Sequence, residues 1–150
     1  MNKNKKVYVD INNAHTDDMV KVLQKIIDDG VDPFSLEYMH KYHGKPILKV
    51  ATHWYVTESK WIYPNAKNHL LFVTIRYVES IIELKPDDIV EFLSLIDEFS
   101  TEYGIKGGAV CMRFGETSLT GATVKHLHAH LFEADMEKGS VTFPVGRKKR

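Results

Sequence analysis

The most informative segment of the 150-residue chain reads Thr123-Val124-Lys125-His126-Leu127-His128-Ala129-His130-Leu131-Phe132. Three of the eight histidines stand in it at a spacing of two residues. Side chains of a β-strand alternate between its two faces. We therefore expect a strand over residues 122–132 that places His126, His128 and His130 on one face and the intervening apolar residues in the core.

Such a row of imidazoles suits chemistry at phosphorus. A neutral imidazole is a nucleophile near neutral pH, so the middle residue, His128, is suited to attack phosphorus and carry the transferred group. Its other ring nitrogen then needs an acceptor, and a backbone carbonyl would serve. His126 and His130 would donate hydrogen bonds to phosphate oxygens or to the leaving group. A zinc-dependent enzyme is the alternative, because His-x-His on a strand is also zinc geometry, with His69 or Glu133 as a third ligand.

The rest of the sequence predicts an α+β domain. Apolar residues at helical spacing indicate helices over residues 17–29 and 86–103. A short helix from Pro33 to about residue 42 is expected after the first of them, before the core begins. Residues 115–121 are expected to form a loop. Strands are expected in four further segments rich in β-branched and aromatic residues: 47–56, 70–76, 109–114 and, at a sheet edge because of Pro144, 140–145. One long helix among strands favours a mostly antiparallel sheet.

Composition and charge exclude several classes of protein. The 43% of hydrophobic residues support a packed core and exclude a disordered chain, and no segment is apolar enough to span a membrane. The single cysteine, Cys111, excludes an intrachain disulfide and a four-cysteine zinc site. With no secretory signal in the sequence, we expect a cytoplasmic protein. Seven of the 20 basic residues stand at the two ends of the sequence, which leaves an acidic body and argues against an extended nucleic-acid surface.

Residues 126–132 also match, at every position, the signature of the histidine triad (HIT) superfamily, His-φ-His-φ-His-φ-φ, where φ is apolar. The resemblance covers about residues 47–135, because the segments around Asn68-His69, Val78-Glu79 and Met112-Arg113 are similar to the elements that precede the signature. It implies a HIT-like fold with a roughly five-stranded antiparallel sheet and one long helix, usually in a homodimer. We expect three parts: an N-terminal helical extension (1–45), a HIT-like catalytic domain (46–146) and a basic C-terminal tail (147–150).

The resemblance further implies roles for individual residues. His128 matches the nucleophile, His126 matches a residue that supports the site, and His130 matches a contact to the phosphate or the leaving group. Four other residues are expected to bind substrate: His69, which would brace the triad; Thr123, near the phosphates; Arg113, where many relatives carry Asn or Gln; and Asn65, in a loop near the ribose and base. Neither a cofactor nor a metal is expected.

The predicted function is a nucleotide hydrolase. It would act at the α-phosphorus of a dinucleoside polyphosphate or a nucleoside phosphoramidate, through a nucleotidyl-histidine intermediate. Two alternatives stay open: a nucleotidyltransferase or phosphorylase, in which phosphate or a sugar phosphate replaces water, and a nucleotide-binding module without catalysis. Ala122 stands where many relatives carry Gln, so the length of the phosphate chain and the leaving group stay undetermined.

Overall fold

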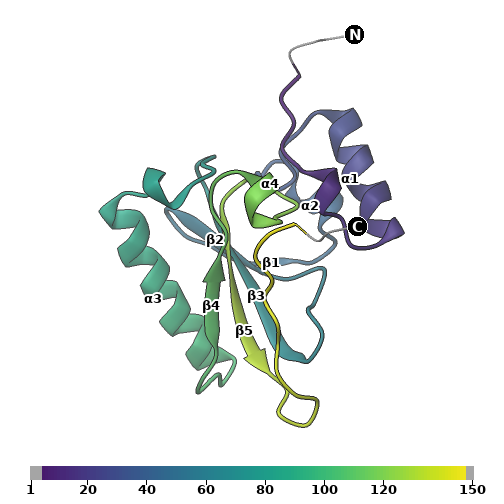
Figure 1. Ribbon diagram of the computed structural model, residues 1–150. Helices are drawn as coiled ribbons and strands as arrows, with labels where there is room; N and C mark the ends of the chain where they lie inside the picture. Colours follow the sequence, from purple (N-terminus) through teal and green to yellow (C-terminus); the bar gives the residue numbers. More distant parts are fainter. Residues whose placement is uncertain (1–4, 148–150) are drawn as a thin grey trace.

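The computed structural model describes residues 5–147 and is built around a five-stranded sheet (Figure 1). Each strand is antiparallel to its neighbour, which confirms the expected α+β class. The spatial order is β1 (Ile47–Val50), β2 (Trp54–Glu58), β3 (Ala66–Thr74), β5 (His128–Ala134) and β4 (Ala109–Met112). The strand that carries two of the three triad histidines therefore lies between two others, where its position is fixed from both sides.

The long helix α3 (Pro86–Glu102) covers one face of this sheet. Pro86 suits the first turn, where no amide hydrogen is needed, and the Asp88 carboxylate accepts the Lys85 amide hydrogen there. The helix buries Leu95 and Phe99 against strand residues that alternate toward it. These strand residues are Trp54, Val56, Leu70, Phe72, Ala129 and Leu131.

The N-terminal segment packs on the opposite face. Helix α1 (Asp17–Asp29) begins where the Thr16 hydroxyl accepts the Met19 amide hydrogen, and it ends at Gly30 with a φ of 67°, which glycine adopts without strain. After α1 come Phe34 and the short helix α2 (Met39–Tyr42), whose apolar side chains pack on Tyr55, Leu71 and Val73. Both figures show α1 and α3 on opposite sides of the sheet. Short 3-10 helices lie at Ile11–Asn13 and Ile81–Glu83.

Several boundaries expected from the sequence are wrong. The strand expected over residues 122–132 begins only at His128, because the preceding residues pair with single residues elsewhere, such as Val124 with Val9. The segment 47–56 is split into β1 and β2 by a turn whose amide hydrogens at residues 52–54 go to the Glu91 carboxylate. The expected loop over 115–121 contains the short helix α4 (Thr117–Thr120).

The C-terminal segment is not the edge strand expected at 140–145. It returns past the sheet toward the N-terminal segment (Figure 1). There Phe143 packs against Tyr63, His130 and Phe132. Arg147, the first residue of the expected basic tail, donates to Asp10 and Asn13, and Lys148–Arg150 lie outside the described residues. Within residues 5–147, no helix is long and apolar enough to cross a membrane.

Candidate active site

His128 and His130 project from β5 onto the face opposite α3, where the N-terminal segment packs. Their strand neighbours Ala129 and Leu131 point the other way, into the α3 core, so the alternation expected from the sequence holds for this pair. The two ring centroids are 5.2 Å apart. His126 precedes the strand, and the prediction that all three histidines stand on one strand is therefore wrong for this residue.

One hydrogen bond fixes the ring of His128. Its Nδ1 lies 2.7 Å from the His126 carbonyl oxygen, which only accepts, so Nδ1 carries the hydrogen and Nε2 keeps its lone pair. Burial lowers the pKa of His128 to about 4, with smaller contributions in the same direction from the charges of His126 and Arg113, against the opposing effect of the carbonyl bond. At neutral pH the ring is therefore neutral and nucleophilic at Nε2.

A chain of hydrogen bonds likewise assigns the tautomer of His130. The Tyr63 amide donates to Nδ1 of His69, so the hydrogen of His69 sits on Nε2. That atom lies 2.8 Å from Nδ1 of His130 and donates to it, which leaves the hydrogen of His130 on its own Nε2. This Nε2 is buried and has no hydrogen-bond partner among residues 5–147. Burial lowers the pKa of His69 to about 4 and that of His130 well below its ordinary value.

His126 is held differently from the other two histidines. Its Nδ1 lies 2.6 Å from Oδ2 of Asp32, and its Nε2 lies 2.6 Å from the Thr74 carbonyl oxygen. The side chain is 1% exposed, and its ring packs T-shaped against the Tyr77 ring. His126 thus has its polar atoms satisfied within the protein and turns its backbone carbonyl, not its ring, toward His128.

A cavity of about 120 Å³ opens between these histidines and the N-terminal segment. His128, His130, Thr123 and Arg113 line one part of it. The other part is an apolar wall contributed mostly by α1 and the residues after it: Met19, Val22, Leu23, Ile26, Pro33 and Phe34. Lys60 and Trp61 also line the cavity. A nucleophilic nitrogen, a buried N–H donor and cationic side chains therefore share one cleft with an apolar surface.

Comparison with solved structures shows what this arrangement is similar to. A histidine triad nucleotide-binding protein from Candida albicans matches with a TM-score of 0.52 and 18% identity over 83% of each chain. A HIT family hydrolase from Clostridium thermocellum matches with a TM-score of 0.51 and 21% identity, over 77% of this chain and 91% of the other. The diadenosine triphosphate hydrolase of Plasmodium falciparum matches with a TM-score of 0.51 and 16% identity, over 61% and 63%.

The chain has the histidine triad fold. No family model and no curated protein matches its sequence. The assignment of the fold therefore rests on the likeness to solved structures and on the His126–Phe132 motif of the chain. The triad histidines occupy β5 and the residues just before it.

The structure brings most of the predicted site residues together. Thr123 and Arg113 line the cavity with His128 and His130, and His69 stands directly behind His130. Arg113 is engaged by the protein itself: its guanidinium donates to the Pro144 carbonyl and the Tyr63 hydroxyl and lies over the Phe143 ring. Asn65 is not with the others. Its amide donates to the Ser140 carbonyl, and the residue is absent from the cavity lining.

Sequence reasoning missed two residues of the triad site. Asp32 bonds to His126, and Phe34 packs T-shaped against the His128 ring with the ring centroids 4.9 Å apart. Tyr63, which the sequence places in the loop before His69, donates to His69 through its amide and packs beside it. Asp32 and Phe34 belong to the segment that lies outside the family resemblance. In the sequence, Asp32 shows only the pattern of a residue before a helix-starting proline, so no signal pointed to a partner 94 residues away.

The alternative zinc site is not assembled. Its candidate ligands His69 and His130 are hydrogen-bonded to each other, so these two ring nitrogens do not point at a common metal position. Across residues 5–147, no group of three or more histidine, cysteine, aspartate or glutamate side chains is arranged to hold a metal ion.

Proposed function

We propose that this histidine triad protein hydrolyses small nucleotides at the α-phosphorus, with His128 as the nucleophile. The observation that carries the proposal is the orientation of His128: a carbonyl holds Nδ1–H, and the lone pair of Nε2 belongs to a ring that lines the cleft. A diadenosine polyphosphate or an adenosine phosphoramidate is the substrate class that we infer.

In the first half of the reaction, Nε2 of His128 forms a bond to the α-phosphorus as the bond from phosphorus to the leaving group breaks. A phosphate leaving group departs with the electron pair and needs no proton, whereas the amine of a phosphoramidate takes up a proton from solvent as it leaves. The ring becomes a nucleotidyl-imidazolium whose Nδ1–H remains bonded to the His126 carbonyl, which opposes the loss of that hydrogen. In the second half, a water oxygen bonds to phosphorus and gives a proton to solvent, the N–P bond breaks with its electron pair returning to Nε2 of His128, and the nucleoside monophosphate leaves.

His130 is the donor for the developing charge on phosphate. Its Nε2–H is buried, unpaired within the described residues, and on a ring whose centroid is 5.2 Å from that of His128. A hydrogen-bond donor without a partner is costly in a buried site, and a nonbridging phosphate oxygen would satisfy it. Because the tautomer is set by His69, this donor is in place before the substrate arrives.

The apolar wall from α1 and Phe34 is proposed to take the base or another apolar part of the substrate. The cavity of about 120 Å³ is smaller than ligand pockets of roughly 300–1,000 Å³. A nucleotide would therefore be enclosed only in part, with its remaining phosphates near Arg113 and Lys60, which also line the cavity.

Turnover of diadenosine polyphosphates and adenosine phosphoramidates tests this proposal. The wild type should release the nucleoside monophosphate, and His128→Ala should lower kcat by at least about a thousandfold, as removal of a nucleophile does elsewhere. His53→Ala, which removes a histidine on the α3 side of the sheet, is the control and should keep its activity. Absence of turnover by the wild type, or equal turnover by His128→Ala, would refute the proposal.

We also propose that the protein forms a homodimer through β4 and α3. Strand β4 is at the edge of the sheet, and its Val110 is 45% exposed. The outer face of α3 presents Val90 and Leu93 at 68% and 62% exposure. An unpaired strand edge beside exposed apolar residues is a surface that a second copy would cover.

A further inference from the structure

Asp32 reaches the triad from outside residues 47–135, over which the sequence resembles the family. Its Oδ2 accepts from Nδ1 of His126 at 2.6 Å, and its Oδ1 accepts from the Phe34 amide at 3.0 Å. Asp32 and His126 are both buried. Both carboxylate oxygens of Asp32 are thus engaged, one by the ring of His126 and the other by the Phe34 amide.

Hydrogen-bond acceptors face both ring nitrogens of His126. Opposite Nδ1 lies the Asp32 carboxylate, and opposite Nε2 lies the Thr74 carbonyl oxygen at 2.6 Å, which only accepts. The Thr74 hydroxyl lies 3.0 Å from the same Nε2, and its own hydrogen goes to the Arg76 carbonyl. Three acceptors therefore surround the ring: the Asp32 carboxylate, the Thr74 carbonyl oxygen and the Thr74 hydroxyl oxygen.

The ring of His126 anchors the peptide that orients the nucleophile. The carbonyl of this peptide accepts Nδ1–H of His128 at 2.7 Å, and its amide, on Leu127, donates to the Val78 carbonyl at 2.8 Å. Residue 126 is thus tied by its side chain to Asp32 and Thr74 and by the following peptide to His128 and Val78. If one anchor is lost, the carbonyl that holds the ring of His128 gains freedom to move.

The Asp32 segment also touches the nucleophile directly. Phe34, whose amide is bonded to Asp32, meets the His128 ring at 4.9 Å with an interplanar angle of 79°. The Phe34 carbonyl accepts the Tyr55 hydroxyl, so a fully buried residue of β2 fixes this segment. The same short stretch therefore contacts His126 through its carboxylate and His128 through its phenyl ring.

We propose that Asp32 is a positioning residue of the active site, which keeps both ring nitrogens of His126 protonated and thereby fixes the carbonyl that orients His128. The N-terminal segment is then part of the catalytic unit. This inference rests on the proposed reaction at His128. In it, Asp32 of the N-terminal segment acts on the nucleophile His128 through His126.

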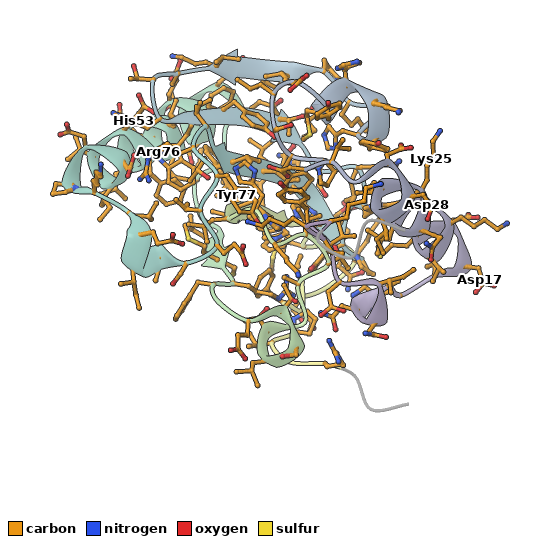
Figure 2. All side chains as sticks on the ribbon, turned by 90° about the horizontal axis from the view of Figure 1, so that it is seen from above. Asp17, Lys25, Asp28, His53, Arg76 and Tyr77 are labelled. Carbon is orange, nitrogen blue, oxygen red and sulfur yellow. The ribbon has the colours of Figure 1, made fainter. Side chains whose placement is uncertain are left out.

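Asp32→Asn tests the assignment. The amide keeps the shape of the side chain but carries no charge to balance an imidazolium, so His126 should lose one ring hydrogen and with it one anchor. With diadenosine triphosphate as the probe, kcat should fall by about 10–100-fold, the range for removal of a residue that orients a site ligand, while KM should change little. Asp88→Asn is the matched control, because Asp88 is also buried and pairs with a histidine, His53, on the α3 side; Figure 2 shows His53 far from α1.

Nitrogen-15 NMR of the histidine rings gives a readout that does not depend on activity. In the wild type, both nitrogens of His126 should show attached hydrogens at neutral pH, and Asp32→Asn should leave one. A wild-type His126 with a single ring hydrogen would overturn the assignment even if the variant failed to fold, and so would an Asp32→Asn enzyme with unchanged kcat. If the wild type does not turn over any nucleotide, the proposed function fails, and the NMR result still decides the state of the Asp32–His126 pair.

Discussion

Lowering the pH from 7 to 5 should destabilise this fold strongly, because the site buries neutral histidines. The pKa of His69 and of His128 is lowered to about 4 in the folded chain, against about 6.5 in an unfolded one. Between these values the unfolded chain binds more protons, so this contribution to stability is complete above about pH 6.5 and is lost as the pH falls toward 4. For each of the two residues the loss from pH 7 to pH 5 is about 2 kcal/mol.

The two histidines together therefore remove about 4 kcal/mol, a large part of the 5–15 kcal/mol that stabilises a typical domain. His130 and His43, whose pKa values burial also lowers, add to the loss in the same direction. Urea unfolding followed by tryptophan fluorescence at pH 7 and pH 5 measures the free energy of unfolding at each pH.

A variant separates this effect from general acid sensitivity. His69→Gln keeps an N–H donor for His130 but cannot bind a proton, so its loss between pH 7 and pH 5 should be smaller than that of the wild type by about 2 kcal/mol. His40→Gln, the same substitution at an exposed position of α2, should keep the wild-type loss. A wild type that loses less than about 1 kcal/mol, or a His69→Gln variant with the full loss, would refute the reasoning.

Three further predictions concern the cleft and the surface. Gly121→Ala should destabilise the fold by about 1–3 kcal/mol in urea unfolding, because φ is +83° and the added Cβ would lie 2.3 Å from the Gly146 carbonyl oxygen; unchanged stability would contradict this packing. Arg113→Ala should raise KM for diadenosine triphosphate about 10-fold or more, since a charge-assisted hydrogen bond contributes about 1.5–3 kcal/mol, and an unchanged KM would remove Arg113 from the binding site. Val110→Lys should convert a dimer into a monomer in sedimentation analysis, and a dimer that survives it would place the interface elsewhere.

Much of the fold follows from local patterns. Helical spacing of apolar residues is enough to find α1 and α3, because each must bury one stripe against the sheet. Period-two alternation is enough to place His128 and His130 on the face away from the core. The order of strands around one long helix favours an antiparallel sheet, and the family resemblance adds its number of strands.

The remaining features depend on partners that are distant in the sequence. The strand of the triad begins at His128 because the backbone before it pairs elsewhere: the Leu127 amide donates to the Val78 carbonyl, and Val124 pairs with Val9. The break between β1 and β2 is stabilised by Glu91, which lies 37–39 residues from the amides that it accepts. Neither Glu91 nor Asp32 differs in its local sequence from an ordinary surface acid, so only the folded chain reveals their contacts.

The proposed reaction requires His128 to form the bond to phosphorus. The most direct measurement is mass spectrometry of the intact chain, mixed rapidly with diadenosine triphosphate and quenched at alkaline pH, followed by mapping of the modified peptide. We expect the mass of one adenylyl group on His128, and none on the His128→Ala variant. Turnover without an adduct, or an adduct on a different residue, would contradict the mechanism.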